Sequence, residues 1–377
     1  MDSFRVSPAR NGGALIDILV DDAFRGKGAD ASPNAVDEAV DLTPEQRLVD
    51  AVFLEDGALH VVRDQGAVEV PDERNDCLGM EWYRHELQQS SGVGHAAALA
   101  TELEWTADAH MGICALGDAL EVRQETVVVR RKIVQADPES AEERRRLAFT
   151  LSGLAGVQQS IGLADSAIAS FRESVGILQA MSAQEPENAN LAWEALYREA
   201  RLARLLAATG DQAAAAEILT SGVRRARELA GRGDGPADFS EVEVELFELD
   251  HARILIDRGE VDEGEARVRA ATSSLATVTT EKPDFGLAVY ALAMAYFEYW
   301  QYFGETPGEV FETLLEPVES EPNAMMSCDD ASVAARLAVA RGDLKRAEKL
   351  VDYALQKGYY EPRFIAFCRR YGLSEAL

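Results

Sequence analysis

Residues 151–171 read LSGLAGVQQSIGLADSAIASF, two helical patterns that meet at one glycine. Leu151, Leu154 and Ala155 recur at the spacing of one helix face before Gly162. Glycine ends helices because it adopts the left-handed conformation without a Cβ clash. Ala167, five residues later, is small enough to let the following helix approach the first closely. The stretch therefore predicts an antiparallel helical hairpin.

The same marker recurs along the chain: a glycine, usually followed by an acidic residue, with a small residue often five positions later. The marker glycines are Gly117, Gly162, Gly210, Gly259, Gly304 and Gly342. They are separated by 45, 48, 49, 45 and 38 residues. Repetition at this period is the sequence signature of a solenoid. Residues 95–360 are therefore predicted to form an α-solenoid of about six helical hairpins.

Three of these hairpins resemble the tetratricopeptide repeat. The residues that carry the resemblance are Leu151 to Phe171, Leu202 to Leu219, and Ala334 to Ala354. The family repeat spans about 34 residues, so the steps here are longer and the helices or their connections must be extended. The resemblance implies that the first helix of each hairpin lines a concave groove.

The flanking segments follow different patterns. Residues 1–80 predict a small α/β or irregular arm, with a strand at 14–20, a helix start at the capping box of Thr43 to Gln46, and a hairpin that turns at Asp56-Gly57. Residues 361–377 predict a capping helix, because Arg363 to Tyr371 is amphipathic and terminal repeats must shield their apolar face.

The net charge of −29 bears on the class of partner. Nucleic acid and anionic membrane surfaces require basic footprints, so both are predicted not to be partners. A basic protein or peptide is a better partner than either of these. The interpretation preferred for the acidity itself is that it keeps a solvated helical array soluble.

The cysteines and the N-terminus suggest a compartment. Cys77, Cys114, Cys328 and Cys368 are isolated in sequence, which predicts free thiols in a reducing cytosol. The first residues lack an apolar signal core. The longest apolar run, residues 287–297, is far shorter than the ~20 residues of a membrane span. These features predict a cytoplasmic protein.

No stretch matches a catalytic, metal or cofactor motif. His85-Glu86 begins like the zinc-protease helix motif but lacks the second histidine. Ser91 to His95 is glycine-rich but lacks a third glycine and a P-loop lysine. The sequence therefore predicts no catalytic residues, no metal and no cofactor.

A candidate binding surface follows from the repeat register. The groove position six residues before each marker glycine holds Gly156, Arg204, Arg253, Glu298 and Arg336. Tyr197 falls on the same face, so Tyr197, Arg204, Arg253 and Arg336 are the predicted partner-binding residues. Arginine forks grip planar carboxylates, so the partner is expected to carry one. The alternative is that each arginine pairs with a neighbouring acidic residue.

The pattern as a whole predicts a non-catalytic scaffold that binds a peptide or protein on its concave face. An alternative is a signal-responsive regulator, in which residues 1–80 sense or transmit a signal and the array gates them. A third reading is an enzyme whose groups assemble between arm and array, since fold alone does not exclude one. The sequence does not assign an oligomeric state.

Overall fold

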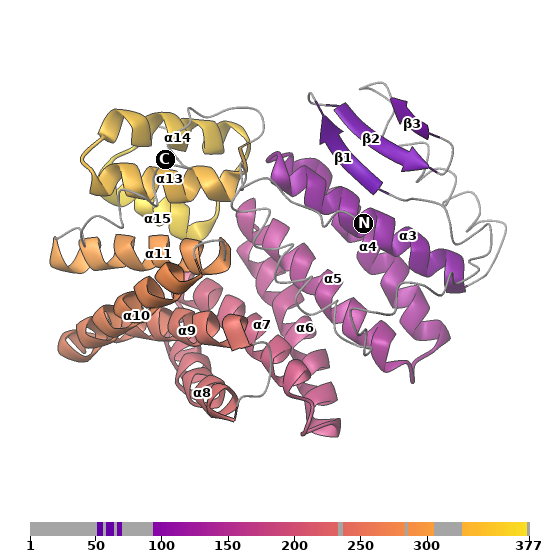
Figure 1. The fold of residues 1–377 in the computed structure, drawn as a ribbon, viewed down its shortest axis with the longest axis horizontal. Coiled ribbons are helices and arrows are strands. Elements are labelled where there is room, and N and C mark those ends of the chain that lie inside the picture. The colour runs from indigo at the N-terminus through magenta and orange to yellow at the C-terminus, as the bar shows by residue number, and fades with distance from the viewer. Residues whose placement is uncertain are drawn as a thin grey trace.

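The protein is an array of antiparallel helical hairpins. The computed structural model describes residues 51–55, 58–63, 66–69, 93–232, 237–282, 286–304 and 326–374. The helices of these residues stack in chain order, as Figure 1 shows. Their bounds are α3 Val93–Gly112, α4 Leu116–Ala136, α5 Ala141–Ser160, α6 Ala164–Gln184, α7 Ala189–Ala208, α8 Gln212–Gly231, α9 Ala237–Asp257, α10 Val261–Glu281, α11 Gly286–Phe303, α13 Cys328–Ala340, α14 Leu344–Gln356 and α15 Pro362–Tyr371.

A left-handed residue ends the first helix of each described hairpin. Gly162, Gly210, Gly259 and Gly342 have φ values of 81°, 98°, 87° and 77°. After each one, the next backbone N–H donates to a carbonyl five residues earlier, as from Asp211 to Leu206 over 2.8 Å. This bond satisfies a carbonyl that the helix end would otherwise leave without a partner. The marker glycines therefore end these helices in the left-handed conformation, as predicted.

The first hairpin departs from this prediction. Gly117 lies inside α4, and the left-handed position is occupied by Cys114, with a φ of 58°. The Ala115 N–H donates to the His110 carbonyl over 2.8 Å, which is the same bond as in the other turns. The Gly117-Asp118 dipeptide matches the marker pattern, but it lies three residues after the turn, at Cys114. With Cys114 in its place, the first two steps are both 48 residues.

Small residues one turn into the second helices set the distance within each hairpin. Ala119, Ala167, Ala215 and Ala347 are all fully buried. At Gly264 an added Cβ would lie 2.8 Å from the Ala252 carbonyl oxygen, so α9 and α10 approach too closely for any side chain there. The marker's small position is therefore a packing requirement.

Helix length accounts for the long repeat step. The helices from α3 to α10 contain 20 or 21 residues each. At 1.5 Å per residue such helices are about 30 Å long. The helices α13 and α14 contain only 13 residues each. The array is thus tetratricopeptide-like in turn and packing, with longer helices.

The last hairpin of the array returns to the first. A disulfide joins Cys114 at the end of α3 to Cys328 at the start of α13, with 5.4 Å between their Cα atoms. Cys114 and Leu116 share a buried apolar cluster with α13, α14 and α15. The Tyr360 N–H also donates to the Ser160 carbonyl at the end of α5 over 2.6 Å. The stack of helices is curved, as Figure 1 shows, and this curvature brings its two ends together.

This closure corrects the prediction that the cysteines are free. Cys114 and Cys328 are 214 residues apart in sequence, and only the curvature of the whole array makes them neighbours. Cys368 is free and buried, and Cys77 lies outside the described residues. The inference of a reducing compartment from unpaired cysteines therefore loses its basis.

The helix α15 packs inside the array as well as against its end. Phe364 is fully buried, and Phe367 contacts Phe297 of α11 edge to face, with 5.7 Å between ring centroids. The helix also contacts α7, two hairpins before α11. The predicted amphipathic helix exists, and its apolar face fills the space between the inner helices.

Three strands lie before the array. They are β1 Ala51–Glu55, β2 Ala58–Arg63 and β3 Gly66–Glu69, paired antiparallel in that order. Glu55 opposes Ala58, so β1 and β2 form the hairpin predicted around Asp56-Gly57. The predicted strand at 14–20 and the helix start at Thr43 lie outside the described residues. Among the residues that are described, no helix combines the length and the apolar character needed to cross a membrane.

Candidate binding cavity

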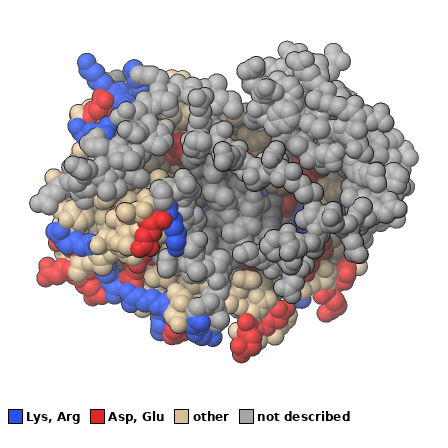
Figure 2. Space-filling model, viewed as in Figure 1, with Lys and Arg blue, Asp and Glu red and all other residues tan. Residues whose placement is uncertain are grey.

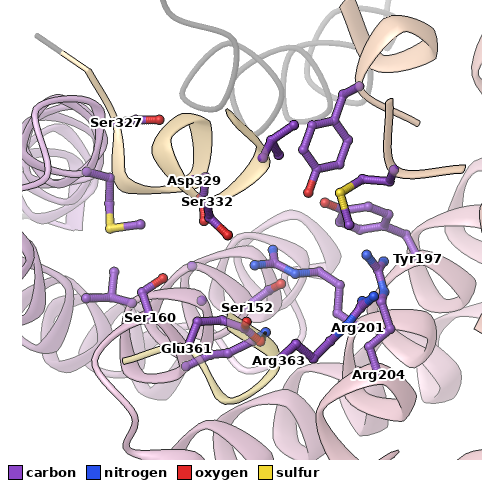
Figure 3. Close-up of a pocket in the computed structure, with 18 of the residues that line it drawn as sticks. Ser152, Ser160, Tyr197, Arg201, Arg204, Ser327, Asp329, Ser332, Glu361 and Arg363 are labelled. Carbon is purple, nitrogen blue, oxygen red and sulfur yellow. Dashed lines mark hydrogen bonds between the residues drawn. The ribbon is translucent and has the colours of Figure 1, made fainter. Parts of the chain in front are cut away.

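A cavity of about 200 Å³ lies on the inner side of the array. Side chains reach it from the first helix of each hairpin, from α4 and from the segment that leads into α15. Figure 3 shows Arg201 and Arg204 approaching from α7, while Asp329 and Ser332 approach from α13. Helices far apart in the sequence therefore build one site, and the ring closure holds them in place.

The predicted groove register leads to this cavity. Tyr197, Arg204 and Arg336 line it, as does Gly156. Arg253, from the same register, is not part of the lining. It pairs instead with Glu298 of α11 and, over 3.4 Å, with Asp250 of its own helix. The repeat register thus brings three of the four predicted residues together and leaves the fourth in a neighbouring ion cluster.

The cavity is cationic although the chain is acidic. Six arginines line it against four carboxylates, in a protein with a net charge of −29. On the face shown in Figure 2, acidic and basic side chains are interspersed over the described surface. The lining therefore reverses the sign of the overall charge. The arginines are Arg123, Arg198, Arg201, Arg204, Arg336 and Arg363, and the carboxylates are Asp108, Glu243, Asp329 and Glu361.

Ion pairs between successive hairpins brace the inner face. The Arg145 Nε lies 3.0 Å from both carboxylate oxygens of Glu194 on the next inner helix. One hairpin further, the Arg204 Nε lies 3.1 Å from Asp250, and the Arg253–Glu298 pair continues the series. Arg204 and Arg253 therefore pair with acidic neighbours, as the alternative interpretation of the sequence expected. Arg336 donates to the Ser332 carbonyl oxygen of its own helix, over 3.0 Å.

Three lining arginines stack on aromatic rings. The guanidinium of Arg198 lies 4.0 Å from the centre of the Phe149 ring. That of Arg201 lies 5.1 Å from the Phe171 ring, and that of Arg336 lies 5.1 Å from the Phe367 ring. These contacts between cations and aromatic rings help to hold the three guanidinium groups beside the cavity.

Two glycines in the middle of α5 make room for guanidinium groups. A Cβ at Gly156 would lie 2.7 Å from Nη2 of Arg201, and one at Gly153 would lie 2.9 Å from Cζ of Arg123. Glycine inside a helix costs about 1 kcal/mol relative to alanine. The helix carries this cost twice, at the positions where arginines lie against its backbone. A Cβ at either position would displace the end of the arginine side chain, so the glycines allow both guanidinium groups to lie against the helix backbone.

Glu243 is the least satisfied polar group of the lining. It is 1% exposed, and neither carboxylate oxygen has a hydrogen-bond partner among the described residues. Burial raises the pKa of Glu243 to about 7, against the opposing attraction of Arg204, Arg201 and Arg198. Near neutral pH the cavity therefore holds a carboxyl group that exchanges a proton and has hydrogen-bonding capacity to offer.

Several of these residues were missed from the sequence. Arg198, Arg201 and Arg204 are spaced three residues apart, so each is a neighbour of the next on the helix surface. This spacing was a usable signal. Glu243 and Arg363 gave none, since acidic residues are abundant and Arg363 comes from outside the repeats. The aromatic run 296–303 divides between the core, where Tyr296 and Phe297 are buried, and the contacts of Tyr299 and Phe303 with Arg269.

Comparison with known proteins gives likenesses only at the level of solved structures. No family model and no curated protein matches the chain. The chain is similar to BtubC from P. vanneervenii, with 17% identity, 64% of this chain and 90% of that chain covered, and a TM-score of 0.33. PilW, a widely conserved type IV pilus biogenesis factor, aligns with 14% identity over 73% of this chain and 98% of its own, with a TM-score of 0.34.

A tetratricopeptide repeat protein from Parabacteroides merdae ATCC 43184 aligns with 14% identity over 78% of this chain and 98% of its own, again with a TM-score of 0.34. At these TM-scores the likenesses carry no argument about function. The repeated left-handed turn, the small packing residue and the curved stack of hairpins stand on the chain's own geometry. By these features the chain is a helical-repeat array whose turns and packing resemble those of the tetratricopeptide repeat.

Proposed function

We propose that this protein is a non-catalytic interaction scaffold that receives a segment of a partner protein at the inner cavity of its helical array. The observation that carries the proposal is the cationic cavity at the centre of an acidic array. Tyr197, Arg204 and Arg336 are proposed to contact the partner. Arg253 is proposed to act indirectly, by holding Glu298 and the neighbouring hairpin in place.

The size of the cavity limits how much of a partner enters it. About 200 Å³ is less than the roughly 300–1,000 Å³ of pockets that enclose drug-sized molecules. In an open solenoid an extended peptide would lie along the concave groove. Here α15 packs against the inner helix α7, and the two ends of the array are joined, so much of that groove is filled. The proposed mode is therefore insertion of a chain end or a single side chain, and no longer a peptide lying along the whole concave face.

A peptide display experiment tests this function. The full-length protein would be screened against random peptides presented with free C-termini, beside the Arg204→Gln/Arg336→Gln variant. Arg224→Gln is the matched control, because Arg224 lies exposed on α8 and pairs only with Glu228 four residues away among the described residues. Circular dichroism would verify that each variant is folded.

The proposal predicts that the wild type and the control enrich the same peptide motif. The double variant is expected to lose that enrichment while remaining folded. Retention of the motif by the folded double variant would place binding elsewhere, and absence of any enrichment by the wild type would contradict the scaffold function.

A further inference from the structure

The cavity offers a hydrogen-bonding group that no described residue uses. Both oxygens of Glu243 are buried without a partner among the described residues. A buried polar group without a hydrogen bond costs free energy, which a ligand group inside the cavity recovers. Glu243 also lines the cavity together with Arg201 and Arg204. Any occupant of this space therefore meets a carboxyl group and guanidinium groups at once.

The charges around Glu243 favour an anion. Arg198, Arg201 and Arg204 act on it from α7, and Asp250 acts on it from its own helix. Tyr290 of α11 and Arg363, at the start of α15, line the same cavity. Asp250 and Glu298, behind the lining, pair with Arg204 and Arg363 and reduce the positive charge there. The groups that face the occupant directly still include more arginines than carboxylates, so an anion is favoured over a cation.

The remaining lining indicates that the anion is organic. Phe149, Leu246, Leu287 and Met294 contribute apolar surface beside the arginines. An inorganic ion would leave this surface without a contact, while an acid with a short apolar body would bury it. The planar fork of a guanidinium matches the two oxygens of a carboxylate.

We propose that the cavity binds the carboxylate of a small organic acid or of a peptide C-terminus, between Arg201 and Arg204 on one side and the hydrogen-bonding carboxyl group of Glu243 on the other. This inference rests on the proposed function and names the group that the site recognises. A carboxylate ligand and an ionised Glu243 repel each other, so the ligand binds with Glu243 protonated, and the protonated group donates to the bound anion. At a pH where free Glu243 is ionised, binding takes up a proton. Gly156 keeps the space in which the Arg201 guanidinium lies.

Isothermal titration of the full-length protein tests the group that is bound. The probes are N-acetylalanine, N-acetylalaninamide and inorganic phosphate. The acid is expected to bind, and the amide and phosphate are not. Because the pKa of Glu243 is about 7, binding of the acid is expected to weaken on the order of tenfold between about pH 6 and about pH 8. Equal binding of the amide, or absence of binding by the acid at about pH 6, overturns the proposal.

Variants separate the site from general effects on folding. Glu243→Gln keeps a hydrogen-bond donor and removes the titration, so it is expected to bind the acid with the pH dependence lost. Gly156→Ala introduces a Cβ against Arg201 and is expected to weaken binding several-fold. Gly176→Ala, inside α6 with nothing within 4 Å of the added Cβ, is the matched control and is expected to bind as the wild type. Unchanged pH dependence in Glu243→Gln would contradict the role of Glu243.

The two sources of a carboxylate give different results. N-acetylated peptides that end in the displayed motif would be titrated with free and with amidated C-termini. Loss of binding on amidation identifies a chain end as the ligand. If N-acetylalanine binds but no displayed peptide does, the carboxylate site stands and the partner-protein function fails. If free and amidated peptides bind equally, the scaffold function stands and the carboxylate site fails.

Discussion

At the scale of single residues, Glu243 is a carboxyl group that is buried away from water without a hydrogen-bond partner among the described residues. Burial dominates its environment and raises its pKa from the model-peptide value of 4.5 to about 7. The folded protein therefore holds a proton that the unfolded chain releases between these two pH values. It follows that Glu243 favours folding at low pH, and that this contribution is lost as the pH rises from about 4.5 to about 7.

Glu243→Gln is expected to flatten part of the pH dependence of stability. Above about pH 7 the wild type carries a buried charge that glutamine does not, so the variant is expected to be more stable there by about 2–3 kcal/mol. Near pH 4.5 the two proteins are expected to differ little. Urea unfolding across this range measures the difference, and a constant offset at all pH values would contradict the assignment.

The Arg253–Glu298 pair gives a second prediction at this scale. Glu298 is 5% exposed, and attraction by Arg253 and Arg363 lowers its pKa despite burial. The Arg253 side chain is 21% exposed, and Arg363 remains 3.5 Å from Glu298 when Arg253 is removed. Arg253→Ala therefore removes one of two cations beside Glu298 and is expected to cost about 2 kcal/mol. Replacing both partners, as Arg253→Met/Glu298→Gln, is expected to recover most of this loss. A double-mutant cycle in chemical denaturation shows whether it does.

The sequence predicted the register of the inner face better than its contacts. Arg204, Arg336 and Tyr197 were located because distance from a left-handed glycine fixes which way a helical residue faces. The partner of Arg253 was not predictable, since several acidic residues of the next hairpin lie within reach of any given arginine. Glu243 and Arg363 could not be found, because their role depends on how α9 and α15 pack.

At the scale of elements, the hairpin is defined by its left-handed turn and by the small residue that follows. Glycine adopts the left-handed conformation at four of the five described turns between paired helices, and Cys114 adopts it at the first. The pattern was predictable because it depends on local backbone geometry. The exception was not, since a non-glycine residue adopts this conformation only when surrounding contacts impose it.

Gly210→Ala and Gly176→Ala are predicted to change stability in opposite directions. Gly210 has a φ of 98°, where a Cβ is strained although the surrounding space is empty, so alanine is expected to cost about 1–2 kcal/mol. Gly176 lies inside α6 in open space, where alanine is expected to gain about 0.5–1 kcal/mol. Thermal unfolding of both variants compares them directly. A stabilising effect at Gly210 would contradict the turn geometry.

At the scale of the whole molecule, ring closure distinguishes this array from an open solenoid. The Cys114–Cys328 disulfide, the shared apolar cluster and the backbone bond between Tyr360 and Ser160 join its two ends. The sequence predicted about six hairpins from the period of the markers, and the described residues contain five paired hairpins and the helix α11. The sequence could not predict closure, because curvature accumulates from small rotations at every interface between hairpins. Residues near both joined ends, among them Met111 and Ser327, line the cavity.

Removing the disulfide is expected to destabilise the protein. It spans 214 residues, and in the chain-entropy model a loop of this size places the stabilisation near the upper end of the ~0–5 kcal/mol range. Cys114→Ser/Cys328→Ser is expected to melt at a lower temperature than the oxidised wild type and to be insensitive to reductant. Mass spectrometry of a non-reduced digest identifies the linkage. An oxidised wild type whose melting temperature does not change on reduction would contradict a stabilising disulfide.

The central claim, that the inner cavity is a carboxylate site, is tested most directly by an anomalous-diffraction experiment on crystals soaked with 3-bromobenzoate. The bromine atom reveals the position of the ligand independently of any assumption about where it binds. A bromine peak is expected inside the cavity, with the carboxylate directed at Arg201 and Arg204 and within hydrogen-bonding distance of Glu243. Bromine peaks confined to the outer surface, with the cavity empty, would contradict it.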